Sequence, residues 1–272
     1  MKIINLSILI LFVNIGICQQ SWQQFKDDKI NYYASLEQSD VKNFSCLISS
    51  SEYIRFIKDI ADSTFYYPLK VVWMIEGKVY YIMQTFPPAL TDSTQQQLIN
   101  KVEDLKKVFK GTLSDWQQFA LITPFKDIPE NAIANFKQDT VGLSFTVSEN
   151  NQTISLKKTF TAAGELARVV WASSDLRIAT YPYYNVVENK WVCQGWKSQF
   201  YRKGEVSSGL VVGLDLNKIE NVWLPNRIEI VAQSKKYPDQ KSIMQLFLKN
   251  YVFNENFEVV KNPSQNPDSL QK

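Results

Sequence analysis

The feature that most constrains this chain is a succession of short β-strand patterns that begins at Val141 and continues almost to the end. Each segment is rich in β-branched and aromatic residues, and turn-forming pairs such as Lys203-Gly204 separate neighbouring segments. The segments span 142–148, 153–160, 166–171, 175–181, 190–201, 209–214, 227–233 and 242–253. Because the connections are too short for crossover helices, the pattern predicts an antiparallel meander.

The region before the meander mixes helix and strand signals. Apolar residues recur at helical spacing between Trp22 and Leu36, which predicts an N-terminal helix. A strand is expected over 41–49, and the segment 51–59 fits either a short helix or a further extended piece. The first part of the chain therefore adds helices to a fold that is mainly β.

Residues 70–83 predict a hairpin, because two runs of β-branched and aromatic residues flank Glu76-Gly77. The period changes over 91–110, where apolar residues recur every three or four positions, and this spacing predicts a helix that ends at Gly111. Residues 112–140 show no dominant period, and we interpret them as a lid or an insertion.

Length and composition fit one domain. A chain of 272 residues with 45% hydrophobic residues can bury a substantial core, and all-β domains of about 200–250 residues often remain single. We expect one β-rich domain over 19–260. The tail 261–272 contains two prolines and little apolar material, so it is expected to be disordered.

The first 18 residues have the pattern of a secretory signal peptide. Lys2 precedes an almost wholly apolar run over 3–17, and polar residues follow from Gln19. The run is shorter than the ~20 residues of a membrane span, so the mature chain is expected to have no integral span. The segment ending at Cys18 also resembles the lipobox of bacterial lipoproteins, although bulky Ile17 stands where that motif has a small residue. A lipid anchor at Cys18 is therefore the alternative to a soluble exported chain.

Two cysteines remain in the mature chain, Cys46 and Cys193. An exported compartment permits a disulfide between them. The alternative is two buried thiols, because free cysteine packs as a small hydrophobe and spacing does not report the distance between the two Cα atoms.

The composition excludes several kinds of chemistry. The chain has 0 His, so histidine-dependent triads, general bases and zinc sites are excluded, and no Gly-rich phosphate loop is present. We expect no cofactor and no metal. The formal charge of +3 is spread along the chain, which argues against a nucleic-acid partner. A carboxylate-dependent hydrolase using Asp215, Glu220 or Glu229 is the enzymatic alternative to a non-catalytic protein.

The last strand patterns differ in how their apolar residues are placed. In 227–232, apolar Ile228 and Ile230 alternate with charged residues, which indicates one dry face and one wet face. The segment 242–248 is apolar on nearly both faces. One of its faces therefore packs the core, and the other contacts a helix, a second sheet or a ligand.

The C-terminal third resembles the closing strands of the outer-membrane lipoprotein-sorting family. A Trp223-Leu224-Pro225 segment leads into one strand, and the next strand runs into Asn250-Tyr251. The resemblance covers about 45 residues. It implies a curved, incomplete antiparallel β-barrel covered by helices, with a hydrophobic cavity for acyl chains, in a periplasmic protein. It also implies lipid, lipoprotein acyl chains or an envelope protein as partners.

From these observations we expect a non-catalytic carrier whose candidate ligand-binding residues are Trp171, Ile228, Ile230, Met244 and Phe247. Strand alternation prevents Met244 and Phe247 from both facing inward unless a bulge intervenes. Ile230 and Phe247 are also expected to be inaccessible to water unless a ligand site opens beside them. The main alternative is an envelope structural or interaction module whose sheet is filled by its own helices, and an open apolar cavity distinguishes the two.

Overall fold

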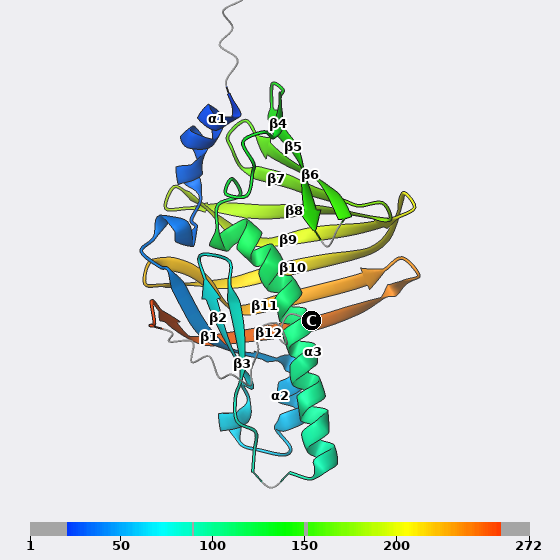
Figure 1. The fold of residues 1–272 in the computed structure, drawn as a ribbon. Coiled ribbons are helices and arrows are strands. Elements are labelled where there is room, and N and C mark those ends of the chain that lie inside the picture. The colour runs from blue at the N-terminus through cyan, green and yellow to red at the C-terminus, as the bar shows by residue number, and fades with distance from the viewer. Residues whose placement is uncertain (1–20, 89, 150–151, 257–272) are drawn as a thin grey trace, which may run out of the picture.

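The structure, a computed structural model, describes residues 21–88, 90–149 and 152–256 (Figure 1). Within these residues the chain forms a 12-stranded antiparallel sheet and three α-helices. The strands are β1 (Asn43–Ser50), β2 (Leu69–Met74), β3 (Val79–Met83), β4 (Ile133–Phe136), β5 (Thr140–Glu149), β6 (Gln152–Thr161), β7 (Leu166–Ala172), β8 (Leu176–Val187), β9 (Lys190–Arg202), β10 (Glu205–Ile219), β11 (Val222–Ser234) and β12 (Tyr237–Phe253). The helices are α1 (Trp22–Lys29), α2 (Ser51–Ile57) and α3 (Asp92–Trp116).

The sheet is one open surface. Its strand order is β3-β2-β1-β12-β11-β10-β9-β8-β7-β6-β5-β4, so from β4 to β12 each strand pairs with the next one in sequence. The antiparallel meander predicted from the sequence is confirmed, as is the hairpin over 70–83, which forms β2 and β3. The first strand, β1, pairs with the last, β12, and this contact joins the two ends of the described chain in one sheet.

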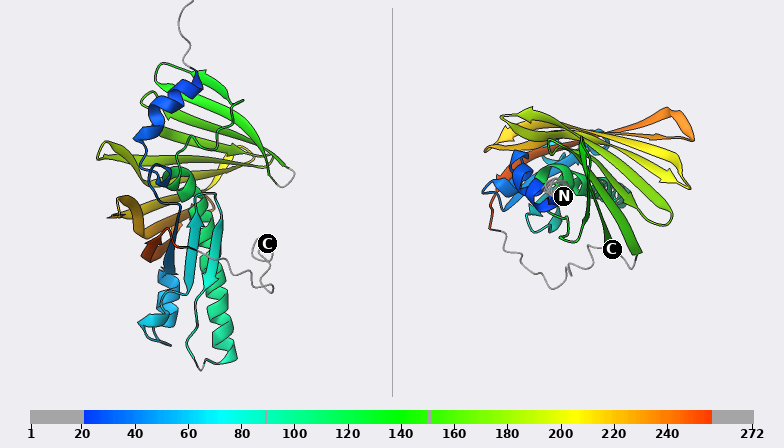
Figure 2. Two further views of the ribbon diagram at one scale, coloured as in Figure 1. Left: turned by 60° about the vertical axis from the view of Figure 1, so that its left-hand side comes forward. Right: turned by 90° about the horizontal axis from the view of Figure 1, so that it is seen from above.

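The sheet twists and curves around α3, which crosses its concave side (Figure 2). The apolar residues of α3 that recur at helical spacing are buried, among them Leu98, Val102, Leu105 and Phe109. At the N-terminal strands, Phe44 of β1 stacks on Trp73 with ring centroids 5.4 Å apart and lies 5.9 Å from the ring of Trp116. This aromatic cluster fixes the end of α3 against β1 and β2.

Helix α3 extends beyond its predicted end. Thr91 caps its start, accepting a hydrogen bond from the backbone N–H of Thr94. However, the prediction that Gly111 stops the helix is wrong, since α3 continues to Trp116 and is followed by a π-helical turn over Gln117–Leu121. Burial of Leu113 and Trp116 beyond the glycine offsets its helix penalty of about 1 kcal/mol.

The N-terminal helix is shorter than predicted. Helix α1 ends at Lys29, and a 3₁₀ turn over Ile30–Tyr32 leads into extended backbone. The chain leaves the helix because Tyr33 is inserted into the core, where its hydroxyl donates to Gly164 O and accepts from Leu166 N, each at 2.8 Å. The segment 51–59, for which helix and strand were both open, begins with helix α2.

Residues 112–140 form part of the core rather than a lid or an insertion. Phe119, Leu121 and Phe125 are buried, and the Phe125 ring stacks on Phe160 at 4.6 Å. Lys158 of β6 is buried beneath this segment and donates to Pro124 O at 2.7 Å. Burial lowers the pKa of Lys158 to about 8, against the opposing charge of Asp127.

Cys46 and Cys193 are free thiols, and both are buried. The possible disulfide is therefore not formed, and the alternative of two packed thiols is the one observed. Burial raises the pKa of each thiol, that of Cys193 to about 12.

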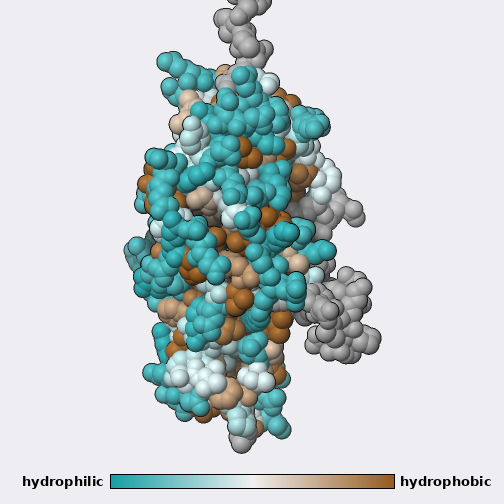
Figure 3. Space-filling view, turned by 90° about the vertical axis from the view of Figure 1, so that its left-hand side faces the viewer, coloured by the Kyte–Doolittle hydropathy of each residue, from teal (hydrophilic) through white to brown (hydrophobic). Residues whose placement is uncertain are grey.

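The described helices include none with the length and apolar character of a membrane span. Apolar side chains are interspersed with polar ones on the face shown in Figure 3, as is usual for protein surfaces. The predicted signal peptide with Cys18, and the tail over 261–272, lie outside the described residues.

Candidate functional site

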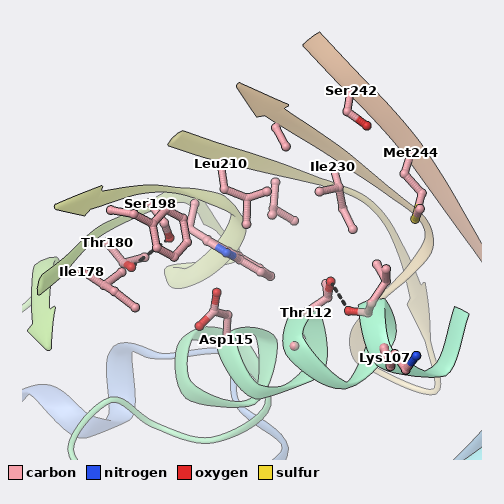
Figure 4. A pocket seen from close by; sticks show the side chains of 16 residues that line it. Lys107, Thr112, Asp115, Ile178, Thr180, Ser198, Leu210, Ile230, Ser242 and Met244 are labelled. Atoms are coloured by element: carbon pink, nitrogen blue, oxygen red, sulfur yellow. Dashed lines mark hydrogen bonds between the residues drawn. The ribbon is translucent and has the colours of Figure 1, made fainter. Parts of the chain in front are cut away.

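A cavity of about 510 Å³ lies between α3 and the concave face of strands β8 to β12 (Figure 4). Its volume falls within the ~300–1,000 Å³ range of small-molecule sites. Strands β8 to β12 form its floor, and five residues of α3 form its opposite wall.

The floor consists of cross-strand rows set by the register of the sheet. One row is apolar and runs through Trp196, Val212, Ile230 and Met244 on β9 to β12. Ile178 and Phe200 form a second, shorter apolar row on β8 and β9. Side chains that pair directly across antiparallel strands lie on the same face, so each row is continuous.

The row between these two contains smaller side chains. It runs through Thr180, Ser198, Leu210, Ala232 and Ser242. Leu210 apart, the hydroxyl and methyl groups of this row do not reach as far from the sheet as the aromatic and branched residues on either side. The middle row therefore leaves room above the sheet.

The helix contributes one face to the cavity. Lys107, Gly111 and Asp115 are spaced by four residues and so lie along one side of α3, with Val108 and Thr112 beside them. A Cβ atom added at Gly111 would meet no heavy atom within 4 Å, apart from the helix's own backbone. The helix therefore covers the sheet without filling the space opposite the small-residue row.

Most polar groups of the cavity are paired within the protein. The Thr180 and Ser198 hydroxyls lie 2.9 Å apart in a buried hydrogen bond. Thr112 Oγ1 donates to Val108 O on the preceding turn at 3.0 Å. These contacts satisfy the hydroxyls of Thr112, Thr180 and Ser198 and leave the cavity mainly apolar.

Asp115 is the exception. Burial raises the pKa of its carboxyl to about 6, and the neighbouring indole N–H of Trp196 partly opposes that rise. Figure 4 shows the Asp115 carboxyl rising from α3 toward the strands of the floor. Trp196 Nε1 is buried and has no partner at normal hydrogen-bond geometry, so the two groups face one another without a fully formed bond.

The structure separates the five predicted ligand-binding residues. Ile230 and Met244 line the cavity and pair with each other across β11 and β12. Ile228 lies on the same face of β11 as Ile230, but it is fully buried in the core. Trp171 pairs with Ile178 and so shares the concave face, yet it does not line the cavity.

Phe247 points to the opposite face of β12. It is only half-buried, whereas its neighbours Leu246 and Leu248 are buried. The expectation that Met244 and Phe247 do not both face inward is therefore confirmed, and the expectation that Phe247 is inaccessible is wrong. Ile230 is buried as expected.

Asp115, Gly111 and the Thr180–Ser198 pair are site residues that the sequence did not reveal. For the two helix residues the signal was their four-residue spacing with Lys107, which is visible in the sequence but does not tell which strands the helix crosses.

The carboxylates considered for hydrolysis lie elsewhere. Asp215 forms a partly exposed ion pair with Arg227 at 3.3 Å, and Glu229 is exposed and accepts from Gln245 at 3.0 Å. Glu220 is exposed in the turn between β10 and β11. None of the three lines the cavity. The described part of the chain contains no cluster of three or more His, Cys, Asp or Glu side chains suited to a metal ion.

Comparison with family models, with curated proteins and with solved structures finds no match to this chain.

Proposed function

We propose that this protein is an exported, non-catalytic binding or carrier protein that holds an apolar ligand, such as a lipid or a lipoprotein acyl chain, between α3 and the concave sheet. The observation that carries the proposal is the cavity of about 510 Å³ over β8 to β12. An interaction module filled by its own helix would have side chains in this space. Here α3 leaves open space beside Gly111, where an added Cβ atom would meet no heavy atom within 4 Å.

The lining suits an alkyl chain. Ile178, Leu210, Val212 and Met244 offer apolar contacts from three different strands, so a chain lying across the floor would touch several of them. Each methylene removed from water contributes about 0.8 kcal/mol before the costs of binding are subtracted. A chain of several methylenes is then sufficient for useful affinity.

The architecture supports the same proposal. A curved open sheet with a helix across its concave face is the arrangement that the resemblance of the C-terminal strands implies, and we propose that it is an incomplete barrel of that kind. In this proposal the protein acts in the periplasm and passes its cargo to an envelope partner.

The test measures how the delipidated mature protein binds N-phenyl-1-naphthylamine. This neutral apolar dye fluoresces when it is removed from water. We expect saturable binding. Ala232→Phe places a ring in the middle of the floor and should weaken binding at least tenfold. Val231→Phe adds the same ring to the same strand on the opposite face, and it should leave binding within about twofold of wild type.

Native mass spectrometry of the protein as purified should also detect a bound lipid. If the dye shows no saturable binding, or if Ala232→Phe folds and binds as well as Val231→Phe, the carrier proposal fails and the interaction-module hypothesis replaces it.

A further inference from the structure

The α3 wall of the cavity has a charged side chain toward each end, the Asp115 carboxylate at one and the Lys107 ammonium at the other. Asp115 lies near the Thr180–Ser198 pair, whereas Met244 lies toward Lys107 (Figure 4). Lys107 and Asp115 are eight residues apart, which corresponds to about 12 Å along α3. An elongated ligand in this space would therefore have its head at Asp115 and its tail toward Met244.

The Asp115 carboxylate lacks a cationic partner. Trp196, Thr180 and Ser198 face this end of the cavity from the sheet, and Gly111 and Thr112 are its neighbours on the helix, so none of the surrounding groups is basic. Lys107, the cation of the cavity wall, is largely exposed and pairs with Asp104 at 3.5 Å. Among the described residues, no Lys or Arg forms an ion pair with Asp115.

A half-buried carboxylate without a cation constrains the ligand. An ionised carboxylate only accepts hydrogen bonds, so it favours a head group that donates them and repels an anionic one. A protonated amine both donates hydrogen bonds and neutralises the charge, and charge-assisted bonds of this kind are stronger than those of a hydroxyl. The low-dielectric surroundings strengthen the attraction further.

We propose that the cavity selects amphiphiles with a positively charged amine head, held at Asp115, and that it discriminates against fatty acids and other anionic amphiphiles. This inference rests on the proposed function, because it assigns the head group of the same apolar ligand. Asp115 is the specificity-determining residue, and the apolar rows supply the affinity that is common to all head groups.

The experiment compares four ligands that share one alkyl chain: dodecylamine, dodecyltrimethylammonium, dodecanol and dodecanoate. Each displaces N-phenyl-1-naphthylamine from delipidated protein at pH 7.5, below its micelle concentration. Wild type should bind dodecylamine at least tenfold more tightly than dodecanoate, with dodecanol between them. Asp115→Asn should reduce the difference between amine and carboxylate to about twofold or less and leave dodecanol nearly unchanged.

Two further variants control the comparison. Asp104→Asn removes the exposed acidic partner of Lys107 from the same helix. It should keep the wild-type ranking, because the amine head binds at Asp115 and not at the Lys107 end. Asp115→Glu keeps the charge and should retain the preference for the amine. If Asp115→Asn does not fold, the affinity rankings in wild type and Asp115→Glu test the proposal. Both proteins should bind dodecylamine more tightly than dodecanoate.

The outcomes separate the two proposals. If none of the four ligands displaces the dye and the dye itself does not bind, the proposed function fails. If all four bind with similar affinity, or if dodecanol or dodecanoate binds best, the amine inference is overturned while the carrier function stands. A preference for the amine that persists in Asp115→Asn also overturns it, because the selectivity then has another source.

Discussion

The replacement Asp115→Asn should stabilise the empty protein in a manner that depends on pH. The carboxyl has a pKa of about 6 in the folded protein, against 3.8 as the ordinary value, and burial is the main cause. The folded state therefore retains a proton between pH 4 and pH 6 that the unfolded state has released. The contribution of Asp115 to the stability of the wild type therefore falls as the pH rises through this window and is constant above it.

The magnitude follows from the two pKa values. One pH unit of pKa change corresponds to about 1.4 kcal/mol, so the rise from 3.8 to about 6 corresponds to about 3 kcal/mol at most. Because Asp115 is partly exposed and water screens part of this penalty, we expect a gain of about 1–3 kcal/mol for Asp115→Asn above pH 6. Asparagine keeps an oxygen that can accept from the Trp196 indole, so the substitution removes charge with little change in shape.

Urea unfolding of wild type and Asp115→Asn at pH 4.0, 5.0, 6.0 and 7.5 measures this effect. The difference in unfolding free energy should be small at pH 4.0, grow to pH 6 and then level off. Asp104→Asn is the control for loss of an acidic group, because its side chain is 74% exposed on the same helix. A difference that is the same at every pH, or an Asn variant less stable than wild type at pH 7.5, would refute the reasoning.

Further predictions concern the helix, the sheet and the thiols. Gly111→Ala should raise the unfolding free energy by about 0.5–1 kcal/mol and keep dye binding, since its Cβ meets open space; a loss of stability would indicate a contact there. Ile228→Ala should cost about 2–5 kcal/mol, and Phe247→Ala clearly less, because only Ile228 is fully buried; equal losses in urea unfolding would contradict the assignment of faces. Cys46 and Cys193 should resist iodoacetamide in the native protein and react without reductant once unfolded; a disulfide-linked peptide by mass spectrometry would contradict this.

The sheet was predictable because strand alternation and turn residues are local signals. The meander and the β2–β3 hairpin were identified from such signals. The pairing of β1 with β12 joins residues about 200 positions apart, so no local sequence pattern predicts it. The end of α3 was missed for a similar reason. Gly111 is a plausible stop by propensity, and only the burial of Trp116 beneath Phe44 explains why the helix continues.

The site was predictable only in part. The alternation of apolar and charged residues correctly predicted that Ile228 and Ile230 lie on the dry face. It could not predict whether Met244 or Phe247 faces inward, because β12 is apolar on both faces over 242–248. The register decides that choice, since Met244 pairs with Ile230. Asp115 was missed because its importance depends on which strands α3 crosses, and no pattern in the helix reports that.

The two faces of α3 explain why a cavity is present without any movement of the helix. Its large apolar residues, from Leu98 to Trp116, are buried in the core, with Trp116 against Phe44 of β1. A different face, with Gly111 and Asp115, lies over the small-residue row of β8 to β12. Because the first face holds the helix in place, the second can leave space without loss of the core. A ligand would then enter a cavity that is already formed, and its binding would not require the protein to repack, which lowers the cost of association.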